Sequence, residues 1–259
     1  MNRIVFLGTA GARVVVFKQL RASGGIWFSL AGTETLVDPG PGSLVRCVSR
    51  REKLDPTKLN AIILTHRHLD HSADVNVMIE AMTESGHVRR GALFAPEDCF
   101  GDDPVVLRYV RDFLEEIVYL KEGEAYAIDG VRLSCPIRHM HGDAETYGLL
   151  FELEKFSVGY ISDTKYFDGL IEAYPADLLI LNVVRYTPIQ YDHLDLEGAK
   201  RLIRGIHPKV AVITHFGMTM LRAKPWEVAS QLSEELGVEV LCARDGLMVD
   251  LDEKLTRPQ

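Results

Sequence analysis

Short runs of apolar residues, each bounded by polar residues or turn formers, recur along the whole chain and predict short strands that alternate with helices. The predicted strands cover residues 4–7, 26–30, 34–37, 61–64, 93–95, 117–120, 125–128, 131–137, 147–153, 156–161, 178–184, 210–213, 238–242 and 246–250. Helical spacing predicts helices from residue 43, capped by Ser43, and over residues 74–84, 105–115, 167–173, 196–206 and 226–236. Two sheets packed face to face, with the helices outside, would bury these runs and gather the strand ends along one edge.

The strand predicted at residues 61–64 is the most informative, because it runs directly into the pattern His-x-His-x-Asp-His. Side chains two apart lie on the same side of an extended chain, so His66 and His68 can point at one ion. Asp70 and His71 fall where the chain turns into the next helix, and we expect them to serve a second ion. Nitrogen together with carboxylate oxygen suits zinc, manganese or iron better than calcium or magnesium. Solvated loop residues are the alternative, but three of the nine histidines within six positions are hard to obtain by chance.

Other candidate ligands have the same local form, an apolar strand with a ligand type at its end. Asp38, Asp163 and His215 each follow a predicted strand, and His139 and His141 both follow the strand predicted at residues 131–137. A site assembled from strand ends is rigid and open on one side. The repetition therefore predicts a metal site at one edge of the sheets, with His139 or His141 as a further ligand.

Length and composition indicate a protein with a large core. The chain has 259 residues, of which 47% are hydrophobic, and no linker, repeat or low-complexity tract divides it, so we expect a single domain over residues 1–259. Its four cysteines are far apart and form no C-x-x-C pair, which argues against a zinc ribbon and a disulfide scaffold and favours a reduced, cytoplasmic setting. No apolar run has the length of a signal peptide core or a membrane span, so we expect a soluble protein.

The net charge indicates which kinds of partner the protein can bind. A formal net charge of −8 disfavours tight, sequence-independent binding to nucleic acid, because that affinity comes mostly from Lys and Arg neutralising phosphates. A local basic group, Arg46, Arg50, Arg51 and Lys53, is expected to be the solvated face of a surface helix. A small substrate is therefore favoured over RNA, although RNA is not excluded.

The chain resembles the metallo-β-lactamase fold superfamily, whose members form a four-layer αββα sandwich with a metal site at one edge of the two sheets. The matching segments are Leu-Val-Asp-Pro-Gly at 36–40, Thr-His-Arg-His-Leu-Asp-His at 65–71, His141 with Thr-Tyr-Gly at 146–148, Tyr-Ile-Ser-Asp-Thr at 160–164 and Ile-Thr-His-Phe-Gly at 213–217. These segments occur in the family's order and span nearly the whole chain. The resemblance therefore implies the α/β sandwich fold and the metal site together.

The resemblance also implies a ligand set for two divalent metal ions, with Zn²⁺ expected and Mn²⁺ or iron as alternatives. One ion would be held by His66, His68 and His141, and the other by Asp70, His71 and His215, with Asp163 bridging both. His141 is preferred to His139 because it lies nearer the Thr-Tyr-Gly segment. Asp38 would orient the site through hydrogen bonds, as metal ligands usually require.

The function implied by the resemblance is hydrolysis by a metal-bridging hydroxide, with Asp70 and His193 as candidate catalytic residues. The opening Phe-Leu-Gly-Thr-Ala-Gly at 6–11 and the loop around His193 look like the ribonuclease Z and cyclic phosphodiesterase branch, where a histidine in a comparable place is thought to act as general acid. Asp192 and Asp195 next to His193 would favour its imidazolium form. A solvated or helix-capping histidine is the alternative.

Within that branch, the sequence favours a small or cyclic phosphodiester, or an RNA end, over a large RNA, because we find no basic or glycine-rich arm of the kind that grips tRNA. A thioester hydrolase of the glyoxalase II kind would use the same two-metal site and stays open. A metal-binding protein without enzymatic activity is a third class, disfavoured because the ligand set is apparently complete. Similar proteins are commonly homodimers, so a homodimer is also expected.

Overall fold

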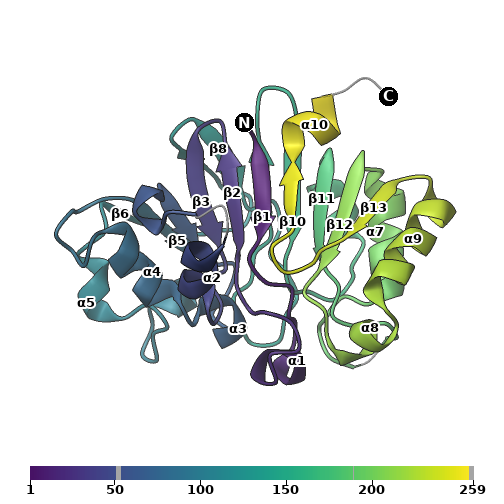
Figure 1. Cartoon of the computed structure of the whole chain (residues 1–259), viewed down its shortest axis with the longest axis horizontal. Coiled ribbons are helices and arrows are strands. Elements are labelled where there is room, and N and C mark those ends of the chain that lie inside the picture. The colour runs from purple at the N-terminus through teal and green to yellow at the C-terminus, as the bar shows by residue number, and fades with distance from the viewer. Residues whose placement is uncertain (51–53, 189, 257–259) are drawn as a thin grey trace.

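In the described part of the chain, two seven-stranded sheets pack face to face (Figure 1). The structure is a computed structural model that describes residues 1–50, 54–188 and 190–256. The first sheet has the strand order β14-β1-β2-β3-β4-β5-β6. Its strands are β1 (Arg3–Phe6), β2 (Ile26–Leu30), β3 (Thr33–Val37), β4 (Ala61–Ile63), β5 (Ala92–Ala95), β6 (Glu116–Tyr119) and β14 (Met248–Asp250).

The second sheet has the order β13-β12-β11-β10-β9-β8-β7. Its strands are β7 (Ala125–Ile128), β8 (Val131–Ser134), β9 (Leu149–Glu152), β10 (Ser157–Ile161), β11 (Leu178–Asn182), β12 (Val210–Thr214) and β13 (Glu239–Cys242). Strands β3 to β6 pair in parallel in the first sheet, and β10 to β13 do so in the second. Because parallel strands all end at the same edge of a sheet, loops far apart in sequence meet there.

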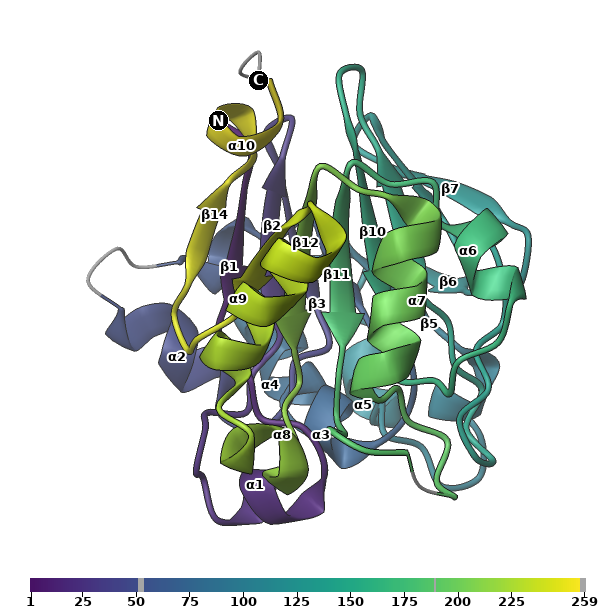
Figure 2. The same cartoon turned by 90° about the vertical axis from the view of Figure 1, so that its right-hand side faces the viewer.

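Helices cover the outer face of each sheet (Figures 1 and 2). The first sheet carries α2 (Ser43–Ser49), α4 (Val75–Met82) and α5 (Arg108–Arg111), and the second carries α6 (Gly169–Ala173), α7 (Leu196–Ile206) and α9 (Pro225–Leu236). Three short helices, α1 (Arg13–Phe17), α3 (Leu69–Ser72) and α8 (Met218–Arg222), lie at the lower edge in Figure 1, and α10 (Leu251–Thr256) lies at the opposite edge. Two 3-10 turns, η1 (Pro56–Lys58) and η2 (Glu97–Cys99), complete the connections described here.

The hydrophobic pattern explains these layers. Alternate strand residues of both sheets face inward and form a central core, in which the rings of Phe28 and Phe151 stack at a centroid distance of 4.8 Å. The helical stripe predicted for residues 74–84 is buried in a second cluster behind the first sheet, which includes Met78 and Ile79. A third cluster, which includes Leu202, packs α7 and α9 behind the second sheet. The predicted αββα sandwich is therefore confirmed.

Two local predictions were wrong. The helix predicted over residues 105–115 forms only at Arg108–Arg111, because the N–H groups of Val105 and Val106 donate to the carbonyl of Cys99 instead of starting a helix. Ser43 is not a helix cap, since Gly42 takes that position at a φ of 88° and the Ser43 hydroxyl donates to the carbonyl of Gly40 at 2.8 Å.

Of the predicted basic group, Arg46 lies on α2, and Arg51 and Lys53 lie outside the described residues. None of the helices in the described ranges is long and apolar enough to cross a membrane.

Candidate metal centre

The candidate ligands follow strands that end at the lower edge of the molecule in Figure 1. Asp38 follows β3, Asp163 follows β10 and His215 follows β12, while the segment after β4 carries His66 and His68. Asp70 and His71 lie one turn further on, in α3, while His141 follows β8 by several residues. Strand ends from both sheets therefore supply the site, as the sequence predicted.

Two glycines allow the surrounding loops to approach closely. A Cβ atom on Gly40 would lie 2.0 Å from the carbonyl oxygen of Asp70, and one on Gly11 would lie 2.0 Å from that of His215. Both separations are far below any van der Waals contact, so only glycine fits at these positions. The Asp-Pro-Gly segment and the Gly-Thr-Ala-Gly segment of the sequence thus support the two ends of the site.

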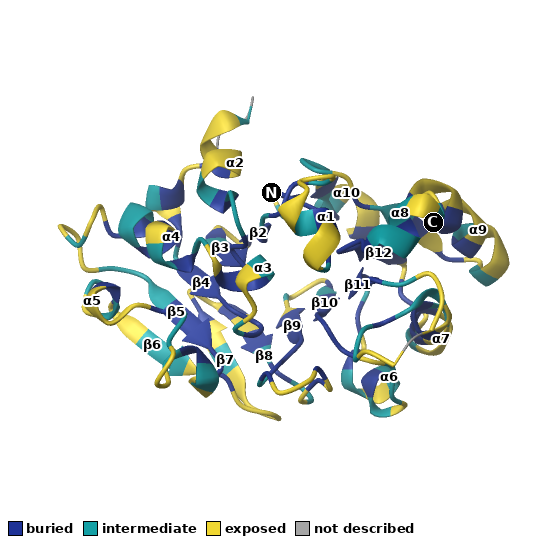
Figure 3. Cartoon of the chain, turned by 90° about the horizontal axis from the view of Figure 1, so that it is seen from below, coloured by how far each residue is buried: buried dark blue, intermediate teal, exposed yellow. Residues whose placement is uncertain are grey.

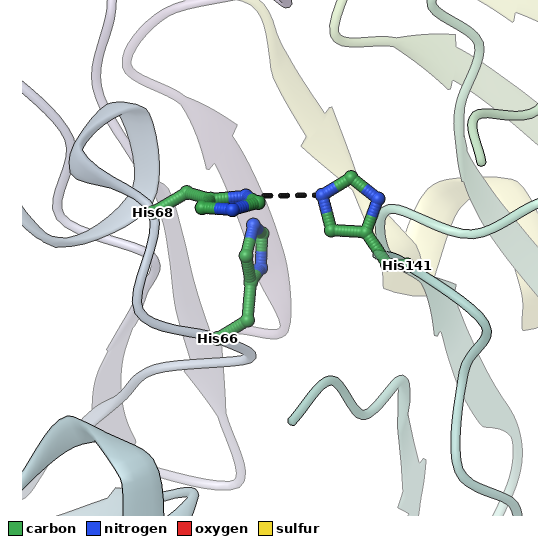
Figure 4. Close-up of side chains that lie close together, drawn as sticks. All are labelled: His66, His68 and His141. Atoms are coloured by element: carbon green, nitrogen blue, oxygen red, sulfur yellow. Dashed lines mark hydrogen bonds between the residues drawn. The ribbon is translucent and has the colours of Figure 1, made fainter. Parts of the chain in front are cut away.

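One group consists of His66, His68 and His141 (Figure 4). Nε2 of His141 lies 3.0 Å from Nδ1 of His68, and the ring of His66 stands edge-on to both other rings, with centroids 4.7 and 5.0 Å away. Nε2 of His66 is buried and makes no hydrogen bond to any described residue. Burial also lowers the pKa of His66 well below its usual value, so this ring is neutral and has a free lone pair.

A second group consists of Asp70, His71 and His215. The Nε2 atoms of His71 and His215 are 3.2 Å apart, and Oδ2 of Asp70 lies 3.8 Å from the first and 3.6 Å from the second. Both histidines are buried, whereas the Asp70 side chain is 24% exposed. Asp70 is therefore the carboxylate of this group that is open to solvent.

Asp163 lies between the two groups. Its Oδ2 is 3.7 Å from Nε2 of both His71 and His141, and its Oδ1 is 3.4 Å from Nε2 of His215. Burial alone would raise the pKa of the Asp163 carboxyl, but His215 and hydrogen bonds from the neighbouring histidines hold it well below its usual value. The carboxylate is thus charged and within reach of both groups.

These separations fit divalent ions. Two nitrogen ligands, each about 2.0–2.1 Å from a tetrahedral zinc ion, are about 3.3 Å apart. The closest separations between donor atoms here range from 3.0 Å, between His68 and His141, to 3.8 Å, between Asp70 and His71. His66 also offers a buried imidazole nitrogen without a hydrogen-bond partner among the described residues, as a metal ligand requires. The donor set of imidazoles and carboxylates suits zinc, manganese or iron.

Hydrogen bonds outside the two groups fix their orientation. Asp38 accepts from the N–H and the hydroxyl of Thr65 at 2.7 and 2.8 Å, from Nδ1 of His71 at 2.9 Å and from the hydroxyl of Tyr160 at 3.2 Å. The bond to Nδ1 turns Nε2 of His71 toward the site, which is the orienting role predicted for Asp38. The carbonyl of Asp192 does the same for His141, whose Nδ1 lies 2.8 Å away.

The structure brings His141, and not His139, to His66 and His68. Nε2 of His139 lies 3.0 Å from the hydroxyl of Tyr174, which packs in the cluster behind the second sheet. Burial lowers the pKa of His139 to about 3, so it is a neutral core histidine. The alternative ligand considered from sequence therefore faces away from both groups.

His193 lies beside the site, but its expected neighbours are elsewhere. Its Nδ1 is 3.4 Å from Oδ2 of Asp163. Asp195 instead caps α7 by accepting from the N–H of Gly198 at 2.7 Å, and Asp192 accepts from the N–H of Gly142 at 3.1 Å. The prediction that Asp192 and Asp195 flank the imidazole of His193 was therefore wrong.

Comparison with known proteins supports membership of the β-lactamase superfamily. The family model of the β-lactamase superfamily domain matches residues 33–216. An uncharacterized protein of Methanocaldococcus jannaschii, MJ1374, is 32% identical over 96% of this chain and 94% of its own length. A ribonuclease Z of Kineococcus radiotolerans is 31% identical, over 38% of this chain and 30% of its own.

Two solved structures share the fold. The metallo-β-lactamase fold protein YhfI of Bacillus subtilis matches with a TM-score of 0.78, covering 96% of this chain and 98% of that one at 19% identity. A diphosphatase of the PhnP family matches with a TM-score of 0.70, covering 96% and 98% at 20% identity. At these identities, the likeness shows the fold alone.

Proposed function

The chain belongs to the β-lactamase superfamily, and we propose that it is a phosphodiesterase that depends on two divalent metal ions. The observation that carries the proposal is that Asp163 lies between a group of three histidines and a group of two histidines with Asp70. In this proposal His66, His68 and His141 hold one ion, Asp70, His71 and His215 hold the other, and Asp163 contacts both. Zn²⁺ is the expected ion, with Mn²⁺ or iron as alternatives.

Two bound ions would supply the electrophilic part of the chemistry, by acidifying a water and polarising a phosphoryl oxygen. Asp70, the more exposed carboxylate of the site, orients the attacking water by accepting a hydrogen bond from it. His193 gives a proton to the oxygen of the leaving alcohol. Because its Nδ1 faces Asp163, its Nε2 is the nitrogen left to make that transfer.

The position of His193 favours an oxygen ester over a thioester. An alkoxide is a poor leaving group and needs a proton in the transition state, whereas a thiol has a pKa near 8.5 and leaves readily as the thiolate. The name of the partly matching relative, ribonuclease Z, agrees with this choice, since ribonucleases cleave phosphodiesters. A glyoxalase II type thioester hydrolase is the second candidate, since the same two groups would serve it.

The substrate is proposed to be a small or cyclic phosphodiester or the end of an RNA. The net charge of −8 supports the small substrate, because extended RNA requires many cationic contacts. The homodimer and the cytoplasmic location stay predictions from the sequence.

The proposal is tested by comparing two substrates with the same metal-loaded protein. We expect turnover of bis-p-nitrophenyl phosphate and none of an acyl-glutathione thioester. His193→Asn, compared with His207→Asn at an exposed position on the far end of α7, should slow alkyl phosphodiesters selectively. Turnover of the thioester alone would replace the phosphodiesterase with the thioesterase.

A further inference from the structure

A cavity of about 500 Å³ opens beside His68, on the side of the metal centre that faces α4 and the loop before α5. Its lining includes Arg67, His68, Leu69, Asn76, Asp103 and Val105. In Figure 3, which looks onto this edge, α3 lies near the middle with α4 and α5 to one side. His68 lines the cavity and is also a proposed metal ligand, so the cavity adjoins the proposed metal centre.

The walls of the cavity are held by their own hydrogen bonds. Asn76 donates from Nδ2 to the carbonyl of Val105 at 2.9 Å and accepts at Oδ1 from the N–H of Leu107 at 2.8 Å. The hydroxyl of Ser72 donates to the carbonyl of Arg67 at 3.0 Å. These polar groups are occupied, and the cavity is therefore preformed.

The guanidinium of Arg67 is the lining group with hydrogen-bonding capacity to spare. Its Nη2 donates to the carbonyl of Asp103 at 3.1 Å and contacts the carboxylate of Asp103 at 3.5 Å, and it makes no other hydrogen bond within the described ranges. The Asp103 side chain is 99% exposed, so water screens the ion pair between Arg67 and Asp103, and this ion pair is weak. An anion entering the cavity can therefore compete for the fork of Arg67.

Resting on the proposed function, we propose that this cavity receives one ester substituent of the phosphodiester, and that Arg67 selects a substituent carrying a phosphate group of its own. A phosphodiester held at the proposed metal centre has two substituents, and in this proposal one of them lies toward His68 and the cavity beside it. The planar fork of arginine matches phosphate oxygens in pairs. Leu69, which is 69% exposed, and Val105 supply apolar surface for the rest of the substituent. The volume lies within the range of small-molecule pockets.

The charge around Arg67 limits the size of this anion. Asp98 interacts electrostatically with Arg67, and the carboxylate of Asp103 lies 3.5 Å from its Nη2. Because these two carboxylates repel anions, they oppose a polyanionic strand more strongly than a single phosphate group held by the fork of Arg67. The substrate class is thus a small phosphodiester with a terminal phosphate.

The test uses a matched pair of substrates, thymidine 5′-(p-nitrophenyl phosphate) with and without a 3′-phosphate. We expect the wild type to prefer the 3′-phosphorylated substrate in kcat/KM by about tenfold or more, the size expected for charge-assisted hydrogen bonds. Arg67→Met should reduce this preference about tenfold. Arg132→Met, which removes an exposed arginine paired with Glu152 on the second sheet, should leave the preference as it is in the wild type.

Binding provides a readout that does not depend on catalysis. Calorimetry of the metal-loaded protein should show tighter binding of thymidine 3′,5′-bisphosphate than of thymidine 5′-monophosphate, and Arg67→Met should abolish the difference. If neither nitrophenyl ester is hydrolysed but this binding difference holds, the proposed function fails while the subsite stands. An unchanged preference in Arg67→Met, or an equal loss in Arg132→Met, overturns the subsite.

Discussion

Replacing Asp38 by Asn tests whether the hydrogen bonds that Asp38 makes behind the proposed metal centre control the affinity of that centre for metal. The carboxylate is buried and accepts four hydrogen bonds, one at Oδ1 and three at Oδ2. In asparagine an NH₂ group replaces one of these two oxygens. If it replaces Oδ1, it faces the N–H of Thr65, and if it replaces Oδ2, it faces the three donors from Thr65, His71 and Tyr160. Leaving one buried donor unsatisfied costs about 1–3 kcal/mol.

The same change loosens His71, because it removes the carboxylate that accepts from Nδ1 of the ring at 2.9 Å and fixes its orientation. Loss of such an outer hydrogen bond typically lowers metal affinity about 10–100-fold. Competition with a chelating dye should show this loss in Asp38→Asn, and urea denaturation of the metal-free protein should show a fall of about 1–3 kcal/mol in the free energy of unfolding.

Tyr160→Phe is the matched control, because it removes one donor to Asp38 at 3.2 Å without touching a proposed ligand. We expect it to keep the metal affinity of the wild type within about threefold, while losing some stability. Wild-type affinity in Asp38→Asn, or an equal loss in Tyr160→Phe, would refute the role assigned to Asp38.

Three further predictions follow from single contacts. Burial lowers the pKa of His139 to about 3, so between about pH 6.5 and 3 the unfolded chain binds a proton that the folded chain does not, and stability is lost as the pH is lowered through this range. In His139→Gln the free energy of unfolding of the metal-free protein should therefore fall less steeply on acidification, by up to about 1.4 kcal/mol per pH unit. An unchanged slope would contradict this. Gly40→Ala should lower both stability and metal affinity, measured by melting and chelation, because its Cβ meets the carbonyl of Asp70; normal values would show that the loop relaxes freely. Asp192→Asn weakens the hydrogen bond that ties the loop carrying His193 to the N–H of Gly142, so it should slow a dialkyl phosphate, which needs a proton on its leaving group, more than methyl p-nitrophenyl phosphate. Equal slowing of the two substrates would indicate a general loss of structure.

The sequence identified the candidate ligands whose signal is local. His66 and His68 lie two apart after an apolar strand, and Asp163 and His215 end strands of their own, so periodicity alone placed them. The layers of the sandwich were equally predictable, because each strand or helix carries its own apolar pattern. The helix over residues 105–115 was predicted too long, because its apolar spacing suits a helix throughout while hydrogen bonds to the carbonyl of Cys99 hold its first part as a loop.

Contacts between distant segments could not be predicted. The nearest carboxylate to His193 is Asp163, thirty residues away, and not the adjacent aspartates in sequence. The choice between His139 and His141 depends on Tyr174, which takes up the first of them. Arg67 lies within the most informative motif, yet its role depends on a cavity whose far wall comes from residues 103–105. Such contacts arise from the tertiary fold, so no local sequence pattern predicts them.

The central claim is that two ions at this site hydrolyse a phosphodiester, and it is tested by titrating metal-free protein with Zn²⁺ while following turnover of bis-p-nitrophenyl phosphate. We expect turnover to rise until two ions are bound per chain, and Asp163→Ala to stay inactive at the same zinc concentration. Full turnover with one ion per chain, in Asp163→Ala, or without added metal would contradict the account.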